Sequence, residues 1–225
     1  MKVGIIGSGV VGQTLGRALA TEGHDVRLGV RLVSNAELDK PRSQALTLRE
    51  WAASTDLKVV TFSEAAAHGD LLILAVGGGV ALDALKLPGE AAIGNKILVD
   101  VSNPLDFSTG TMTLIPSLTN TTSVGEEIQK AYPKARVVKT LNTATISVGV
   151  NPAIVAGGET DMFIAGNDEA AKATVTTILK RDFHWKSVID LGDIVGARGM
   201  EQLFPIWLRL YRRGGTDVFG FRVVR

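Results

Sequence analysis

The strongest constraint on this chain is a glycine-rich turn near its start, between a short apolar run and an amphipathic segment. The apolar run covers residues 2–6, and Gly7-Ser8-Gly9-Val10-Val11-Gly12 follows it without a gap. Residues 11–22 then repeat apolar side chains every three to four positions, which predicts a helix. A Gly-x-Gly-x-x-Gly turn between a strand and a helix is typical of a dinucleotide-binding unit.

The three glycines have separate roles in such a turn. Gly7 permits the tight turn, Gly9 lets the backbone approach a pyrophosphate, and Gly12 lets the helix pack closely on the strand. The helix N-terminus adds free N–H groups and the positive end of its dipole. The chain has 25 glycines, so a merely flexible turn is the alternative. The strand before the motif and the helix after it favour dinucleotide binding.

The residues that follow the second predicted strand, which covers 25–29, indicate whether the chain binds NAD or NADP. An NAD site usually has Asp or Glu there, about 20 residues beyond the glycines. This chain instead has Val30 and Arg31, and no acid before Glu37. Because Arg binds phosphate through charge-assisted hydrogen bonds, Arg31 is predicted to contact the 2′-phosphate of NADP(H). The alternative is that Arg31 is a solvated loop residue.

Strands and helices alternate through residue 140, which predicts an α/β fold with a Rossmann-type doubly wound parallel sheet. The expected strands cover residues 2–6, 25–29, 58–61, 71–76, 97–101 and 136–140. The expected helices cover residues 11–22, 46–54, 64–68, 80–87 and 123–132, with Ser63 capping the third of them and Ser123 the last. Loops are expected at 32–45, over the adenine side, and at 107–122.

The rest of the chain predicts a small α/β C-terminal region. Strands are expected at 162–165 and 187–190 around a helix over 168–180, and a last helix at 195–212, which Pro205 should kink or divide. The expected division is an NADP-binding Rossmann domain over residues 1–140 and a small region over 141–225.

Three of the predicted strands end in short polar or glycine-rich segments. Ala75-Val76 lead into Gly77-Gly78-Gly79, where the backbone could lie against a ligand or could simply turn. Asn103 follows the strand over 97–101, and Asn142 follows the strand over 136–140. Ligands of open α/β sheets bind beyond the carboxyl ends of the strands, so these residues are candidates for the site.

Composition excludes several classes of function. The net charge is +1, which gives no signal for nucleic acid, and the absence of cysteine excludes disulfides and thiolate metal sites. No metal-ligand spacing, signal peptide or membrane-length apolar run is present, so a cytoplasmic protein is expected. The histidines, at positions 24, 68 and 184, are predicted to be structural or solvated. No catalytic residue is predicted, because hydride transfer between two redox rings needs no side-chain acid.

Together, several motifs resemble the NADPH:coenzyme F420 oxidoreductase family over essentially the whole chain. They are the glycine turn, Gly29-Val30-Arg31, Asp100-Val101-Ser102-Asn103-Pro104, Lys139-Thr140-Leu141-Asn142-Thr143, Asp190-Leu191-Gly192-Asp193, Ala197-Arg198-Gly199-Met200-Glu201 and the final Arg222-Val223-Val224-Arg225. Several of them also occur in the NADPH-oxidising domain of six-transmembrane ferric reductases.

The resemblance implies an oxidoreductase that moves a hydride between NADP(H) and coenzyme F420 or a flavin-like ring. It implies that Ser8, Val10 and Val11 join the glycines around the pyrophosphate and that Arg31 binds the 2′-phosphate. Ala75, Val76 and Asn103 would lie near the nicotinamide, Asn142 near the second ring, and the C-terminal region would complete the acceptor cleft. Family members often have a hydroxyl residue where this chain has Val30, which leaves one phosphate donor fewer. A homodimer is implied as well.

Two alternatives remain open from the sequence. One is a reductase of a small carbonyl or imine, although such enzymes have a longer helical region after the Rossmann domain. The other is a non-catalytic NADP-binding sensor, because a fold does not fix a function. The apolar stripe at 203–211 fits either core packing or a dimer interface.

Overall fold

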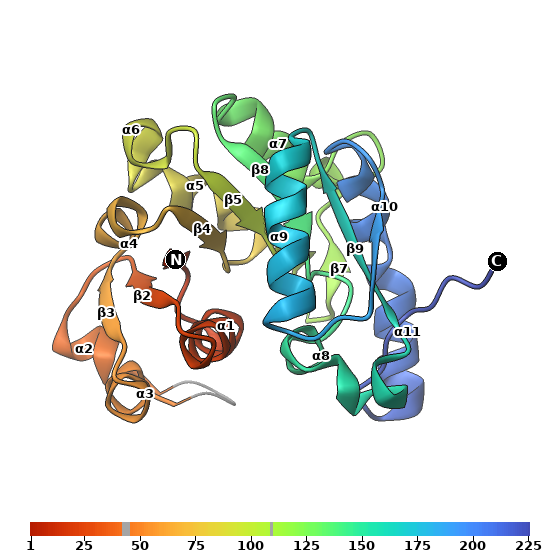
Figure 1. The fold of residues 1–225 in the computed structure, drawn as a ribbon, viewed down its shortest axis with the longest axis horizontal. Helices are drawn as coiled ribbons and strands as arrows, with labels where there is room; N and C mark the ends of the chain where they lie inside the picture. The colour runs from red at the N-terminus through yellow and green to blue at the C-terminus, as the bar shows by residue number, and fades with distance from the viewer. Residues whose placement is uncertain (42–45, 109) are drawn as a thin grey trace.

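One eight-stranded sheet runs through the molecule (Figure 1). The structure is a computed structural model of the 225-residue chain, and it describes residues 1–41, 46–108 and 110–225. The strands of the sheet are β1 (Lys2–Ile6), β2 (Asp25–Val30), β3 (Lys58–Thr61), β4 (Leu71–Leu74), β5 (Ile97–Asp100), β8 (Arg136–Thr140), β9 (Asp161–Gly166) and β10 (Ser187–Asp190). Each of the eight predicted strands is therefore confirmed.

The strand order is β10-β9-β8-β5-β4-β1-β2-β3. From β3 to β8 all neighbours are parallel, and this order is that of a doubly wound dinucleotide-binding sheet. The predicted Rossmann-type fold is confirmed. Beyond β8 the direction reverses, because β9 pairs with β8 antiparallel and β10 continues parallel to β9. The C-terminal region thus extends the same sheet.

Both faces of the central strands are buried, which explains their uninterrupted apolar sequences. Successive side chains of a strand point to opposite faces, so Ile73 joins one core cluster while Leu72 and Leu74 join the other. In β5, Val99 joins the cluster that contains Ile73, and Leu98 joins the cluster that contains Leu72.

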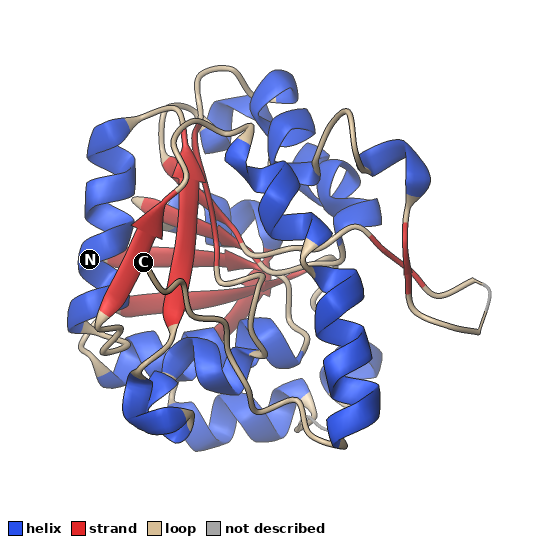
Figure 2. Cartoon of the chain, turned by 90° about the vertical axis from the view of Figure 1, so that its right-hand side faces the viewer, coloured by secondary structure: helices blue, strands red, loops and turns tan. Residues whose placement is uncertain are grey.

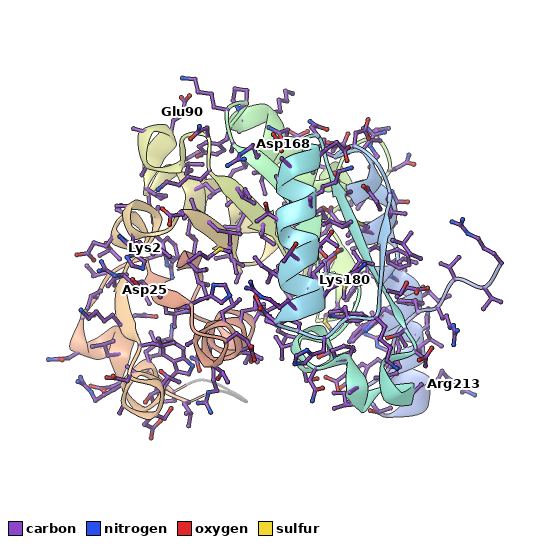
Figure 3. All side chains as sticks on the ribbon, viewed as in Figure 1. Lys2, Asp25, Glu90, Asp168, Lys180 and Arg213 are labelled. Carbon is purple, nitrogen blue, oxygen red and sulfur yellow. The ribbon has the colours of Figure 1, made fainter. Side chains whose placement is uncertain are left out.

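Helices cover both faces (Figure 2). One face is covered by α1 (Val10–Thr21), α3 (Leu48–Thr55), α8 (Ile146–Val150) and α9 (Glu169–Arg181), whose buried residues belong to the first cluster. The opposite face is covered by α4 (Phe62–His68), α5 (Ala81–Lys86), α6 (Gly89–Ile93), α7 (Val124–Ala131) and α10 (Gly196–Gln202). In Figure 3, Asp168 and Lys180 mark the two ends of α9, where their charges complement the helix dipole.

Two of three predictions about helix ends are confirmed, and one is wrong. The expected helix over 195–212 is divided as predicted, into α10 and α11 (Phe204–Gly214), because Pro205 fits the first turn of a new helix. Thr61, not Ser63, caps α4, since its side chain accepts a hydrogen bond from the Glu64 N–H. The cap at Ser123 is confirmed.

The two predicted loops contain more structure than expected. Residues 42–45 and 109, which fall within them, lie outside the described residues. The first loop contains α2 (Asn35–Leu38), capped by Ser34. The second contains β7 (Thr113–Leu114), which pairs with β6 (Leu105–Asp106) in a small hairpin that projects from the body of the molecule (Figure 2).

Candidate functional site

The glycine turn has the geometry of a phosphate cradle. Gly7 adopts φ 128°, and a Cβ there would lie 2.1 Å from the carbonyl oxygen of Ala75. A Cβ at Gly12 would lie 2.0 Å from the carbonyl oxygen of Gly7, so the close packing of α1 on β1 requires glycine. Gly9, by contrast, is exposed and has no atom within 4 Å of its Cβ position. The fold needs Gly7 and Gly12, whereas Gly9 leaves room for a ligand.

The N-terminus of α1 begins directly beyond Gly9, and no side chain caps it. The N–H groups of its first turn have no acceptors within the helix, and the dipole favours negative charge there. An open glycine beside an uncapped helix start offers room and free N–H groups for the pyrophosphate that the sequence predicts there.

Arg31 follows β2 directly and lies at the same edge of the sheet as the glycine turn, because β2 pairs with β1. Its side chain is exposed, and no carboxylate in the described parts of the chain pairs with it. Arg31 is thus available to an anionic ligand.

The segments after β4 and β5 are joined at the same edge. The N–H of Gly78 donates to the carbonyl oxygen of Asn103 at 3.0 Å, and a Cβ at Gly78 would lie 2.6 Å from that oxygen. Ala75 donates its N–H to the carbonyl of Ile6 at 2.8 Å. The backbone at 75–78 therefore lies between the glycine turn and Asn103.

Asn103 and Asn142 form a reciprocal amide pair. The side-chain NH2 of Asn103 donates to the backbone carbonyl of Asn142 at 2.8 Å, and the side-chain NH2 of Asn142 donates to Oδ1 of Asn103 at 2.9 Å. The pair locks the segment after β5 to the segment after β8. Leu141 precedes it with φ 62°, a conformation that costs a β-branched or bulky residue about 1–2 kcal/mol. The backbone is strained where it presents Asn142.

Beneath this edge lies a buried charge cluster of Lys139, Asp100 and Glu201. The Lys139 ammonium lies 2.8 Å from a carboxylate oxygen of each acid, and the three side chains are at most 1% exposed. Lys139 also donates to the carbonyl of Ser102 at 2.6 Å, while Asp100 accepts from the Ser102 N–H. The cluster therefore fixes the segment that carries Asn103.

The charge states in the cluster follow from burial and pairing. Burial alone would lower the pKa of Lys139, but the two carboxylates raise it above its usual range, so the ammonium stays charged. Burial raises the pKa of Glu201, and the nearby Asp100 adds to this, while Lys139 opposes it. Glu201 also accepts the N–H of Val124 at 3.0 Å, at the start of α7.

A cavity of about 380 Å³ opens at this edge of the sheet. Val10 and Val11 line it from α1, and Asn103 and Asn142 from the strand ends. Its far wall is α11, where Trp207 stacks on Phe204 and Tyr211 with ring centroids 5.9 and 5.6 Å apart. Thr145 closes another side through a hydrogen bond to Asp217 at 3.2 Å. An apolar, aromatic-walled cavity of this kind suits a planar ring.

A larger cavity, of about 660 Å³, lies on the other side of α1, among residues such as Gln13, Arg17 and His184. Its lining comes from α1, α3 and α8 and from loop residues such as Leu46 and His184, and none of these residues directly follows a strand of the sheet. We therefore place the site at the smaller cavity, because ligands of doubly wound sheets bind at the carboxyl ends of the strands.

Two of the three histidines have structural contacts. His24 is buried and lies 3.0 Å from a carboxylate oxygen of Asp182, and His68 contacts the backbone carbonyl of Asp25. His184 is exposed. Among residues 1–41, 46–108 and 110–225, no group of three or more acidic or histidine side chains could hold a metal ion.

The fold is that of a Rossmann-type dinucleotide-binding protein, and comparison with known proteins makes it an NADP-dependent oxidoreductase. The family model for NADP oxidoreductases that are coenzyme F420-dependent matches residues 2–104. A solved structure from Arthrobacter sp. FB24, provisionally described as an F420-dependent NADP reductase, is 43% identical, and each chain covers 100% of the other with a TM-score of 0.93. The chain belongs to this F420-dependent NADP oxidoreductase family.

More distant proteins are similar in sequence or in fold. Metalloreductase STEAP3 of Rattus norvegicus is 28% identical over 211 residues, which are 92% of this chain and 38% of that protein. An imine reductase from Streptomyces aurantiacus is 18% identical with a TM-score of 0.63, and the match covers 95% of this chain and 64% of that one. No helix in the described ranges is long and apolar enough to cross a membrane.

The structure brings Val10, Val11, Asn103 and Asn142 to one cavity, with Gly77 and Arg31 at the same edge. The sequence does not predict the aromatic wall as part of the site, since the stripe at 203–211 fits core packing or a dimer interface equally. Its signal was the spacing of Phe204, Trp207 and Tyr211 on one helix face. The charge cluster was not foreseen either, because its members lie far apart in the sequence.

Proposed function

We propose that this protein transfers a hydride between NADP(H) and coenzyme F420 or a similar flavin-like ring. The observation that carries the proposal is the cavity that joins the start of α1 to the aromatic wall of α11. A nicotinamide placed from the glycine turn toward Asn103 would lie beside a second ring against Trp207. Hydride transfer requires this side-by-side arrangement and the exclusion of water.

In this proposal, the binding residues divide along the sheet edge. Gly7, Ser8, Gly9, Val10, Val11 and Gly12 surround the pyrophosphate, and Arg31 binds the 2′-phosphate. Ala75, Val76, Gly77 and Asn103 hold the nicotinamide side. Asn142 faces the second ring, and its reciprocal amide pair with Asn103, together with the strained backbone of the preceding Leu141, fixes its position.

When bound, NADPH supplies the hydride, and the side chains of this chain orient the reactants. Lys139 is wholly buried and bonded to two carboxylates and a carbonyl oxygen, so it holds the loop rather than donating a proton to a ligand. We also propose that residues 1–140 bind NADP and residues 141–225 complete the acceptor cleft. The family resemblance supports a cytoplasmic homodimer, which light scattering and fractionation test.

Reduction of a small carbonyl or imine is the main alternative. It is less well supported, because the solved structure provisionally described as an F420-dependent NADP reductase is 43% identical over the whole chain, whereas the Streptomyces imine reductase is 18% identical. A non-catalytic sensor is disfavoured by the room beside the strand ends for a second ring.

The test is a spectrophotometric assay of purified protein with NADPH or NADH against F420, FMN and a cyclic imine. We expect NADPH to bleach the deazaflavin fastest, with NADH slower. Oxidation of NADPH by the imine alone would contradict the proposal. Tight NADPH binding without transfer to any acceptor would instead favour the sensor.

A further inference from the structure

Helix α11 lines two adjoining hollows. Phe204, Trp207 and Tyr211, at spacings of three and four, face the aromatic cavity described above. A second groove of about 350 Å³ is lined by Phe204, Leu208 and Arg212 at spacings of four, with Pro205 and Arg209 beside them. Because an α-helix has 3.6 residues per turn, these two sets form neighbouring strips along one helix.

The groove adjoins the cavity at two shared side chains. Met112 and Phe204 line both hollows. Opposite α11, the groove is walled by β7, so it runs between the small hairpin and the helix. A ligand whose ring lies in the cavity could therefore extend past Met112 into the groove.

The groove carries two guanidinium groups. Arg209 and Arg212 are exposed, and in the described parts of the chain neither pairs with a carboxylate. Arg49, Arg181 and Arg198, by contrast, each form an ion pair with a neighbouring acid. The described lining of the groove is otherwise neutral, made of Thr, Met, Leu, Phe and Pro side chains. Two uncompensated guanidiniums at one groove favour phosphate or carboxylate groups.

We propose that this groove binds an anionic arm, bearing phosphate or carboxylate groups, on the acceptor whose ring occupies the aromatic cavity. The placement of the ring rests on the proposed function. Eight residues separate Phe204 from Arg212, a rise of about 12 Å along the helix. An arm of that length reaches from the cavity to both guanidiniums. The groove thereby selects acceptors with an anionic arm over the bare ring.

The test compares F420 with its deazaflavin core, which has the same ring and a ribityl chain but lacks the phosphate and carboxylate arm. Binding to the NADP-loaded protein is followed by fluorescence, and hydride transfer is followed separately. The variant is Arg209→Gln with Arg212→Gln, and the control is Arg213→Gln. Arg213 lies at the end of the same helix (Figure 3), outside the lining of the groove.

We expect wild-type protein to bind F420 roughly 10- to 100-fold more tightly than the core, a preference that should weaken in high salt. The double variant should lose this preference while keeping its affinity for the core, and Arg213→Gln should retain it. Equal binding of the two ligands, or a preference that survives in the double variant, overturns the inference.

The two proposals fail in different ways. Transfer to both ligands with no preference would leave the proposed function intact and would show that the groove does not bind the anionic arm. Preferential, arginine-dependent binding of F420 without transfer would support binding of the arm in the groove and would contradict the proposed function. If neither ligand binds, both proposals are wrong. A change in self-association of the double variant, with unchanged F420 affinity, would assign the arginines to a protein contact and overturn the inference.

Discussion

The ammonium of Lys139 lies 2.8 Å from the carboxylate of Asp100, beneath the segment that carries Asn103. Both side chains are fully buried, and the same ammonium also pairs with Glu201. The end of β5, the end of β8 and helix α10 are thus held together by one cation. This contact joins the C-terminal region to the floor of the site.

Lys139→Met should strongly destabilise the fold, because it leaves two buried carboxylates without their counter-ion. We expect the free energy of unfolding to fall by about 3–5 kcal/mol in urea titrations. The matched control is Lys172→Met. The Lys172 side chain is only 4% exposed, but its partners Asp190 and Glu169 are 47% and 84% exposed, so their carboxylates stay hydrated when the ammonium is removed. That variant should lose only about 1 kcal/mol. Equal losses would show that the buried cluster is not specially dependent on Lys139.

Gly12→Ala and Gly9→Ala should separate folding from cofactor binding. The new methyl at position 12 would meet the Gly7 carbonyl oxygen, and we expect a loss of about 1–3 kcal/mol or more in stability. At position 9 the methyl meets no protein atom, so stability should change by less than about 0.5 kcal/mol. The same methyl should raise the Kd for NADPH roughly 10-fold by obstructing the pyrophosphate. Unchanged NADPH affinity in Gly9→Ala would argue against the phosphate cradle.

Arg31→Ala should weaken the binding of NADPH roughly 10- to 100-fold and leave the affinity for NADH nearly unchanged, because only NADPH has the 2′-phosphate. Isothermal titration with both cofactors measures the difference. Arg17→Ala is the control, since Arg17 donates to Ser54 on α3. Equal losses of affinity for the two cofactors in Arg31→Ala would contradict a contact between Arg31 and the 2′-phosphate.

Asp182→Asn should reduce stability in a pH-dependent way. Burial would raise the pKa of Asp182, but hydrogen bonds from Arg181 and His24 lower it below its usual range. A carboxyl with a depressed folded-state pKa stabilises the fold above its unfolded pKa, near 3.9, and loses that contribution as pH falls through the folded value. We expect a loss of about 2 kcal/mol at pH 7 that shrinks below about pH 4.

The control for this prediction is Asp39→Asn, whose ion pair with Arg49 is about half exposed on both sides. It should leave stability nearly unchanged at any pH, because solvent screens an exposed ion pair. A deficit in Asp182→Asn that stays constant from pH 7 to pH 3 would contradict the lowered pKa.

Local sequence patterns predicted the sheet because each strand carries its own signal. The continuous apolar runs around Ile73 and Val99 reflect burial on both faces, and Gly12 is required by a contact with Gly7 inside the first βαβ unit. The prediction that Ser63 caps α4 was wrong, although Thr61 and Glu64 have the same three-residue spacing as Ser123 and Glu126. The signal was present, two residues earlier.

The site was less predictable because its contacts are not local. Lys139 and Glu201 are 62 positions apart, and only the reversal of the chain after β8 brings α10 back to the sheet edge. The strained backbone of Leu141 has no sequence signal either, because glycine or asparagine is usual at positive φ. Trp207 could be placed on an apolar stripe, but not assigned to core, interface or ligand.

Direct hydride transfer is the central claim, and isotope transfer tests it most directly. In a single turnover with NADPH deuterated at the transferable position of C4, the reduced deazaflavin should carry one deuterium, detected by mass spectrometry. The label should persist in ordinary water, because a hydrogen bound to carbon does not exchange rapidly with solvent. Unlabelled product would show that the hydrogen passes through solvent. NADPH that stays unoxidised beside bound F420 would show that F420 is not the acceptor.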